Sequence, residues 1–397
     1  MSNRGNLLTR GFEKYEFEDR INNAQKIMER NNLGCILLAS ESEIYYFTGF
    51  ITQFWQSPTR PWYVVLPLHG KPIAVIPSIG EKLMSSCYVK EIRSWVSPSI
   101  EGDGLSLLKK TLKENVRGSQ KIGLMLGRET SLRMPLGDIF SLYKKFGVEK
   151  FFDVTDNIQY LRMIKSPAEI EKIKYICSRV SRVFSDFPNY LEVGISLSDV
   201  FRQFKVNCLA EGVDDVSYLV GAAGPGGYFD IIAPPSDRPL EEGDVLMLDT
   251  GTKWDGYFCD FDRNFAVGKV DYEVHKIHEI LYDSIDLAVD AIKPNNVSMK
   301  DIFNEMDSFL RSNNLEKNKS SGSVGRYGHG LGIQLTERPS FISWDETMIE
   351  PGMVLTLEPS LLYGEEGFIM VAEENILVTD TGVEFLTSRW PRELKVI

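Results

Sequence analysis

The chain has 397 residues and a formal net charge of −12, with 43% apolar and 25% charged residues. This length exceeds what one hydrophobic core usually holds, so two domains are expected, and the composition excludes an intrinsically disordered chain. The acidic balance argues against nucleic acid or an acidic membrane surface as a partner, because binding to either requires a basic patch.

Helix and strand patterns alternate along the first part of the chain. Residues 16–32 are predicted to form an amphipathic helix, because apolar side chains recur on one face. Short apolar runs predict buried strands at 35–39, 63–67, 72–76 and 122–126, and a second helix pattern covers 105–115. Strands that alternate with helices indicate an α/β domain over residues 1–160.

A helix-start signature marks the beginning of a second domain, residues 161–397. Ser166 fits the N-cap, Pro167 the first helical position and Glu169 the capping-box position. Further helices are predicted at 196–211, 271–293 and 298–313, and strands at 245–249, 354–358 and 374–378. Because these strands begin or end beside acidic residues, they would hold carboxylates rigidly.

Five side chains of the second domain form a pattern suited to divalent cations. They are, in chain order, Asp249, Asp260, His329, Glu358 and Glu373. Hard oxygen ligands with one imidazole favour Mn, Fe(II), Co or Zn over Cu, and four carboxylates balance the charge of two divalent ions. Each residue alone is more often a cap or turn residue than a ligand. The order of all five is specific, and a cation pair suggests hydrolysis by an activated water molecule.

A family resemblance is carried by one acidic string and by the residues around it. The string reads Asp249-x-Gly251…Asp255-Gly-Tyr257…Asp260…Arg263. From Arg162 onward the chain resembles the pita-bread metallopeptidases, which include aminopeptidase P, prolidase, methionine aminopeptidase and creatinase. The preceding part is similar to the amino-terminal domain of the prolidase and creatinase branch. The resemblance implies an α/β creatinase-like amino-terminal domain, an α+β pita-bread catalytic domain and a homodimer.

The resemblance also implies a role for each of the five side chains. Asp249 would chelate one cation, and Asp260 and Glu373 would bridge two. His329 and Glu358 would complete the second cation site and act as catalytic residues, with Glu358 as general base. The expected cofactor is two divalent metal ions (Mn, Fe, Co or Zn), with Mn favoured.

Three positions depart from the peptidase pattern. Thr336 stands where family peptidases have a second histidine, Ile232 where they have an upstream histidine, and Val371 where they have an arginine. The two histidines hold the substrate carbonyl, so their loss should slow peptide hydrolysis by orders of magnitude. Ile232 and Thr336 are accordingly predicted to face the substrate.

An aromatic segment of the first domain is a second candidate for substrate binding. In creatinase-like dimers the matching loop reaches into the partner's active site. Arg60 would then bind a carboxylate, and Trp55 or Trp62 would face a cation. A packed aromatic cluster at a domain or dimer interface explains the same residues equally well.

The favoured function is metal-dependent hydrolysis of an amide or related C–N bond in a small or short-peptide substrate that carries a carboxylate, with an Xaa-Pro dipeptide as the default. One alternative is an enzyme for a small osmolyte: a creatinase-like or ectoine-type C–N hydrolase, or a dimethylsulfoniopropionate-lyase-like enzyme that cleaves a C–S bond. The lyase branch has an aspartate where Leu335 stands here. The other alternative is an inactive metal-binding recognition module, and the complete ligand set argues against it.

The expected location is the cytoplasm. The amino terminus lacks the apolar segment of a signal peptide, and no stretch reaches the length of a membrane span. The five cysteines are odd in number and irregularly spaced, which is typical of reduced thiols.

Overall fold

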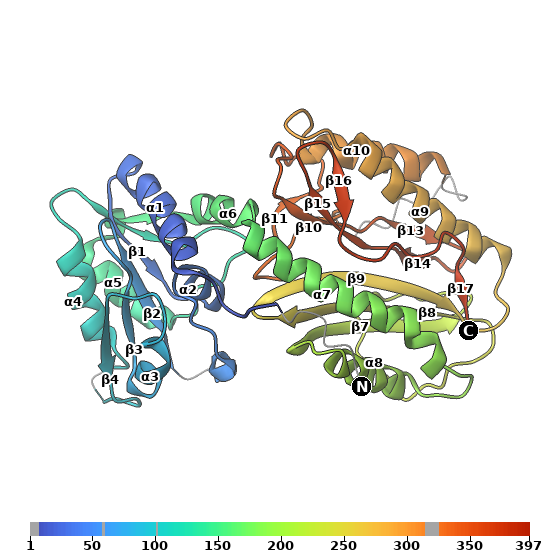
Figure 1. Cartoon of the computed structure of the whole chain (residues 1–397), viewed down its shortest axis with the longest axis horizontal. Coiled ribbons are helices and arrows are strands. Elements are labelled where there is room, and N and C mark those ends of the chain that lie inside the picture. Colours follow the sequence, from blue (N-terminus) through green and yellow to red (C-terminus); the bar gives the residue numbers. More distant parts are fainter. Residues whose placement is uncertain (1–7, 58–59, 101, 314–324) are drawn as a thin grey trace. The chain divides into compact units, whose positions relative to one another are not determined.

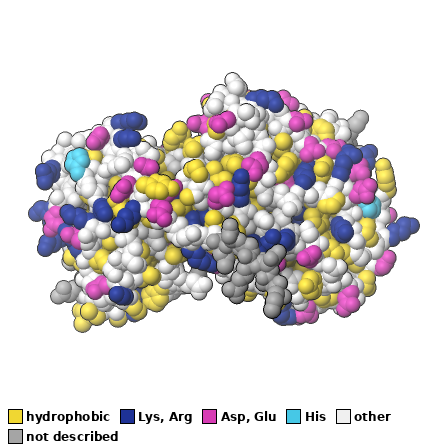
Figure 2. All heavy atoms as spheres, viewed as in Figure 1, with side chains coloured by type: hydrophobic (Ala, Val, Ile, Leu, Met, Phe, Trp, Pro, Cys, Tyr) yellow, Lys and Arg dark blue, Asp and Glu magenta, His cyan; other side chains and the backbone are white. Residues whose placement is uncertain are grey.

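The computed structural model describes residues 8–57, 60–100, 102–313 and 325–397. The chain divides into two compact units, an amino-terminal unit of Thr9–Arg162 and a carboxyl-terminal unit that contains Met163–Ile397. In the described part of the chain, no helix combines the length and apolarity that a membrane crossing requires. On the face that Figure 2 shows, acidic and basic side chains are interspersed among apolar ones.

The amino-terminal unit is an α/β domain built on one mixed sheet (Figure 1). Its elements are α1 (Lys14–Arg30), β1 (Leu33–Leu38), α2 (Glu41–Thr48), η1 (Gln53–Gln56), β2 (Tyr63–Pro67), β3 (Ile73–Pro77), η2 (Ser78–Gly80), α3 (Glu81–Met84), β4 (Glu91–Trp95), α4 (Leu105–Asn115), β5 (Lys121–Leu124), α5 (Leu136–Phe146), η3 (Val148–Lys150), β6 (Phe151–Asp153) and α6 (Thr155–Met163). The strand order is β4-β3-β2-β1-β5-β6, in which β2 runs antiparallel to both of its neighbours. Helix α4 covers one face, where Leu108 and Leu112 pack against Leu37 and Val65.

The carboxyl-terminal unit combines antiparallel sheets with long helices. Its elements are α7 (Pro167–Asp186), η4 (Phe187–Tyr190), α8 (Leu197–Ala210), β7 (Asp215–Pro225), β8 (Asp244–Trp254), β9 (Tyr257–Ala266), α9 (Tyr272–Ala291), α10 (Met299–Asn313), β10 (His329–Gly330), β11 (Glu337–Ser340), β12 (Val354–Leu357), β13 (Ser360–Tyr363), β14 (Phe368–Val371), β15 (Glu374–Val378), β16 (Val383–Phe385) and β17 (Lys395–Val396). One sheet has the order β17-β9-β8-β7, a second β11-β10-β12-β15-β16, and β13 pairs with β14. Helix α7 lies along β9, and α9 packs beside β13 and β14 (Figure 1).

The start of α7 is fixed by the predicted capping box. The Ser166 hydroxyl accepts a hydrogen bond from the backbone of Glu169 at 3.3 Å, and the Glu169 carboxylate accepts one from the backbone of Ser166 at 2.9 Å. The hydroxyl of Tyr257, at the start of β9, donates to Glu169 at 2.7 Å. The capping-box prediction is therefore confirmed, and the same glutamate ties the helix to the strand that carries Asp260.

A buried ion pair holds the turn between β8 and β9 against the same helix. The Lys172 ammonium bonds the carboxylate of Asp255, and both side chains are less than a tenth exposed. Asp255 has a φ of 47°, a left-handed conformation that aspartate tolerates in tight turns. The pair therefore fixes the register of the two strands that present Asp249 and Asp260.

Replacing Lys172 with methionine should lower the free energy of unfolding by about 3–5 kcal/mol, because the buried Asp255 carboxylate loses its ammonium partner. Chemical denaturation would measure the change. The double variant Lys172→Met, Asp255→Asn removes both charges and should regain part of the loss. Equal stability of the wild type and the single variant would show that the pair does not anchor the turn.

Candidate metal centre

The five predicted ligands converge on one place in the carboxyl-terminal unit. One ligand atom from each of Asp260, His329 and Glu373 lies within 4.8 Å of the others. The Nε2 atom of His329 is 3.5 Å from Asp260 Oδ2 and 3.8 Å from Glu358 Oε1. Asp249, Glu358 and Glu373 line one cavity of ≈ 40 Å³. Residues more than a hundred positions apart therefore form a single constellation.

Strand pairing explains this convergence. Asp249 and Asp260 lie on the neighbouring strands β8 and β9. His329 begins β10, Glu358 directly follows β12, and Glu373 directly precedes β15, and these three strands are adjacent in the second sheet. The sequence predicts that the strand at Asp249 ends there, but β8 continues to Trp254. The apolar run stops at Asp249 because a polar cavity begins, while the backbone pairing with β7 and β9 continues.

Hydrogen bonding prepares the His329 imidazole to bind a cation. Its Nδ1 lies 2.9 Å from the carbonyl oxygen of Gly330, which can only accept, so Nδ1 carries the proton. Nε2 is therefore left with a free lone pair that faces the carboxylates. Burial lowers the pKa of His329 to about 4, which keeps the ring neutral near pH 7. The His329 backbone N–H is held by the Thr356 hydroxyl at 3.1 Å.

The carboxylates of the centre repel one another in a poorly hydrated place. Burial, followed in Asp260, Glu358 and Glu373 by neighbouring carboxylates, raises the pKa of all four above the ordinary range. The pKa of Asp249 rises to about 7 and that of Glu358 to about 8. Asp260 and Glu373 are the most buried of the four, at 5% and 3% exposure. Positive charge at the cavity would relieve this repulsion.

The cavity and its donor atoms fit divalent cations. Among the described residues, Asp249 Oδ1 and Glu373 Oε1 are buried without a hydrogen-bond partner. A water molecule needs about 10–15 Å³ of such space, so a cavity of ≈ 40 Å³ has room for more than one small ion or water. Carboxylate oxygens with one imidazole nitrogen form a donor set for Mn, Fe(II), Co or Zn.

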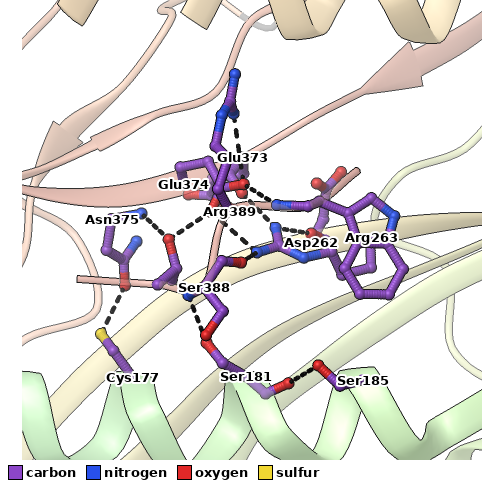
Figure 3. A network of polar contacts seen from close by, with 12 residues as sticks. Cys177, Ser181, Ser185, Asp262, Arg263, Glu373, Glu374, Asn375, Ser388 and Arg389 are labelled. Carbon is purple, nitrogen blue, oxygen red and sulfur yellow. Dashed lines mark hydrogen bonds and ion pairs between the residues drawn. The ribbon is translucent and has the colours of Figure 1, made fainter. Parts of the chain in front are cut away.

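Neighbouring side chains hold the ligand-bearing backbone in place. The buried Asn375 amide accepts a hydrogen bond from the backbone N–H of Asp260 at 3.0 Å and donates one to its carbonyl, joining β15 to β9. The Arg263 guanidinium donates to the carbonyls of Asp262 and Glu373, at 2.7 Å each, and to the Glu374 carboxylate at 2.9 Å (Figure 3). These contacts fix the two strands relative to each other, so that the ligands are preorganised.

Replacing Gly328 with alanine should weaken Mn(II) binding at least about tenfold and lower the melting temperature. Gly328 has a φ of 141°, and a Cβ atom there would lie 2.2 Å from the carbonyl oxygen of Thr356. Strand β10 must therefore move away from β12, and His329 moves with it. Titration calorimetry and thermal unfolding would measure both effects.

Gly325 offers a matched control for this prediction. Its φ of 88° is strained for alanine to a similar degree, but a Cβ atom would meet no described residue within 4 Å. Gly325→Ala should lower stability without changing metal affinity. Equal affinities of the two variants would show that close packing at Gly328 does not position His329.

The predicted substrate-facing positions differ in their surroundings. Ile232 is 69% exposed, and its backbone N–H is bonded to the Asp230 carboxylate at 2.8 Å. The neighbouring Ile231 lines the cavity instead, together with Val371. Thr336 is half-buried in the turn between β10 and β11. The substrate roles of Ile232 and Thr336 stay predictions.

The aromatic segment of the amino-terminal unit is packed. Trp55 and Trp62 are 6% and 2% exposed, and their ring centroids lie 6.0 Å apart. Phe50 packs against both rings. Arg60 is half-buried, with its guanidinium carbon 5.7 Å from the centroid of the Phe54 ring. This arrangement favours the interpretation as a packed cluster, and the role of Arg60, Trp55 and Trp62 in substrate binding stays a prediction.

Residues that the sequence interpretation did not assign also face the centre. Asp262 lines the cavity with Asp249. The hydroxyl of Tyr218, on β7, faces Asp249 and lowers its pKa. Arg326 bonds the hydroxyl of Ser340 at 3.3 Å, and its positive charge lowers the pKa of both Asp260 and Glu358.

Comparison with known proteins identifies a matching family for each of the two parts of the chain. Residues 171–380 match the model of metallopeptidase family M24, and residues 20–164 match that of the creatinase/prolidase N-terminal domain. An Xaa-Pro dipeptidase of Pyrococcus horikoshii is 27% identical over 385 residues, which cover 95% of this chain and 98% of the relative. An uncharacterized peptidase of Staphylococcus aureus is 27% identical over 87% of this chain and 92% of its own. The crystal structure of a recombinant prolidase from Thermococcus sibiricus has a TM-score of 0.84 at 25% identity, covering 98% of this chain and 100% of that one.

The fold and the site together define a class of two-domain metallohydrolases, in which a creatinase-type amino-terminal domain precedes a pita-bread catalytic domain. The fold class predicted from the sequence is therefore confirmed. The chain belongs to metallopeptidase family M24 and is a metallohydrolase of the aminopeptidase P and prolidase group. This membership favours an enzyme over the alternative of an inactive recognition module.

Proposed function

We propose that the chain is a dinuclear metallopeptidase that hydrolyses the amide bond of Xaa-Pro dipeptides. The convergence of Asp249, Asp260, His329, Glu358 and Glu373 on one cavity carries the proposal. These five side chains would hold two divalent cations, with Mn(II) preferred for hard oxygen donors. The relatives named Xaa-Pro dipeptidase and prolidase support the peptide class of substrate.

The cation pair would supply a Lewis acid for the scissile carbonyl and lower the pKa of the attacking water molecule. Glu358 is placed to accept the proton of that water, because its side chain, at 23% exposure, is less buried than those of Asp260 and His329. It would then donate the proton to the leaving nitrogen. His329 is neutral and its ring is fixed by Gly330, so it would bind a cation without competing for this proton.

The cavity wall suits an apolar ring at the reacting bond. Ile231, Met247 and Val371 line the cavity beside the carboxylates. A pyrrolidine ring would bury apolar surface against them, at roughly 25 cal/mol per Å². The chain also lacks the histidine and the arginine that the family resemblance leads one to expect at Ile232 and Val371, so turnover should be slow for the family.

We infer a homodimer in the cytoplasm, following the resemblance to creatinase-type enzymes. All five cysteines are free, and Cys35, Cys177, Cys208 and Cys259 are buried, which suits a reducing compartment. Sedimentation analysis of the purified chain would test the dimer directly.

The deciding experiment is turnover of a panel of Xaa-Pro dipeptides and tripeptides by Mn(II)-reconstituted protein. Xaa-Ala dipeptides and metal-free protein serve as controls. We expect hydrolysis of the Xaa-Pro dipeptides only in the presence of metal. Bound metal without turnover of any peptide would reject the proposal and would direct the search to small osmolytes such as creatine, ectoine and dimethylsulfoniopropionate.

A further inference from the structure

Asp262 is a buried carboxylate in the wall of the metal cavity that the five-ligand set does not use. It follows Asp260 by two residues on β9, so both side chains project from the same face of the strand. Asp262 lies directly opposite Asp249 in the pairing of β8 with β9. It is 2% exposed and lines the same cavity as Asp249, Glu358 and Glu373.

The carboxylate of Asp262 is not satisfied by protein groups. Among the described residues, neither of its two oxygens has a hydrogen-bond partner. The backbone N–H of Glu373 faces it, but no hydrogen bond of normal geometry results. The adjacent Arg263 directs its guanidinium to the Glu374 carboxylate and to the backbone carbonyls of Asp262 and Glu373, as Figure 3 shows.

An unsatisfied buried carboxylate is costly unless a cation compensates it. Leaving a buried polar group without a partner costs about 1–3 kcal/mol, and more for a charged group. An aspartate kept at such a place for packing alone would gain nothing over asparagine, which has the same shape and no charge. The placement of Asp262 against the cavity therefore indicates an electrostatic role toward whatever occupies it.

We propose that Asp262 is a sixth ligating side chain, which coordinates the cation held by Asp249. Cβ atoms of directly opposed residues on antiparallel strands lie about 4.5–5.5 Å apart, so both carboxylates can reach one ion without a change of backbone. The donor set then comprises five carboxylates and one imidazole. This inference rests on the proposed metal centre and extends it: the added negative charge favours a hard, oxygen-seeking cation such as Mn(II) over Zn(II) at that position.

The test compares Mn(II) binding and thermal unfolding in the wild type and in Asp262→Asn. Asparagine keeps the shape of the side chain and removes its charge. We expect two bound ions in the wild type and at least tenfold weaker binding of one of them in the variant. Without metal, the variant should melt at a higher temperature than the wild type, because one of the crowded carboxyl groups that face the cavity is gone. A purely structural role would instead lower the melting temperature of the metal-free variant and leave the affinity unchanged.

Asp244→Asn is a matched control on the same strand pair. Asp244 is fully buried, but it is satisfied by Arg238 at 2.6 and 2.8 Å. This variant should lose stability and keep the wild-type affinity for Mn(II), so that any effect specific to Asp262 stands out from the loss of a buried carboxylate in general.

Two outcomes of the binding experiment would overturn the inference. Binding of two Mn(II) ions by Asp262→Asn with wild-type affinity would remove Asp262 from the ligand set and leave the proposed function intact. Failure of the wild type to bind any divalent cation would instead reject the proposed function together with the inference. If Asp262→Asn does not fold, anomalous diffraction from the Mn(II)-loaded wild type decides: an Asp262 oxygen in the coordination sphere supports the inference, and its absence from both spheres overturns it.

Discussion

Replacing Asp260 with asparagine should abolish metal uptake and peptide turnover together. The carboxylate of Asp260 is 5% exposed and lies within 4.8 Å of the ligand atoms of both His329 and Glu373. A carboxylate in this central position can bridge two cations with its two oxygens, whereas an amide offers one neutral oxygen donor. Loss of a group that only hydrogen-bonds to a metal ligand weakens metal binding about 10–100-fold, or about 1–3 kcal/mol. Loss of the bridging carboxylate itself should weaken metal binding by more than this.

The fold should survive this substitution, which makes the prediction testable. Asn375 holds Asp260 through backbone atoms, and those hydrogen bonds do not depend on the side-chain charge. Metal content by elemental analysis and turnover of an Xaa-Pro dipeptide would be measured on the same preparation. Asp290→Asn removes an exposed carboxylate of α9 and should change neither quantity. Activity retained by Asp260→Asn without bound metal would contradict the metal mechanism.

The five candidate ligands could be selected from the sequence because cation binding restricts residue types so strongly. A pair of divalent ions requires several carboxylates and an imidazole on rigid elements. The order of the five residues and the strand patterns beside them are therefore sufficient to select these candidates, although no pattern in the chain shows which strands are neighbours. The pairing of β10 with β12, and of β12 with β15, supplies that information.

Asp262 could also have been identified, because its signal is local. In Asp260-Phe261-Asp262 the two aspartates are separated by one apolar residue, and this spacing places them on the same face of any strand. Phe261 points to the opposite face and is fully buried. A search for alternating carboxylates within a predicted strand would have added Asp262 to the candidates.

Tyr218 and Arg326 could not be identified in this way. Tyr218 reaches the centre only because β7 pairs with β8 in the register that sets it opposite Gly251. Arg326 bonds Ser340, which lies opposite His329 in the pairing of β10 with β11. Both placements depend on contacts between segments that no local pattern joins.

Tertiary structure also decides which positions face the substrate. Counting residues back from Asp249 selects Ile232, yet Ile231 lines the cavity and Ile232 is 69% exposed. Ile231 and Ile232 lie in a bend in which only the first side chain reaches the cavity, so an offset of one residue exchanges the inside for the outside. The sequence does not predict helix α2, because most of its residues are buried and the segment lacks the polar face that marks an amphipathic helix.

The metal-free protein should become less stable as the pH rises from about 4 to about 8. Burial raises the pKa of Asp249 to about 7 and of Glu358 to about 8, and it raises those of Asp260 and Glu373 well above the ordinary carboxyl range. Between the unfolded and folded pKa values the folded protein binds more protons than the unfolded chain, so each unit of pH costs stability. His329 acts in the opposite direction: with its pKa lowered to about 4, it adds stability as the pH rises toward 6.5. Burial also lowers the pKa of His278 to about 4, so His278 acts in the same direction as His329. The raised pKa values of the four carboxyl groups and of Asp262 outweigh these two histidines and leave a net decrease.

Thermal unfolding of chelator-treated protein between about pH 5 and about pH 8 would measure this slope. Saturating Mn(II) should remove it, because bound cations favour the ionised carboxylates and binding releases their protons. The stabilisation by metal should therefore grow with pH. Asp249→Asn removes one of the four carboxyl groups and should flatten the metal-free curve. A flatter curve would show that the slope comes from the carboxyl groups of the centre and not from the net charge of the protein. A melting temperature of the metal-free wild type that rises throughout this range would show that the carboxylates of the cavity are not held in the repulsive arrangement from which the metal site is inferred.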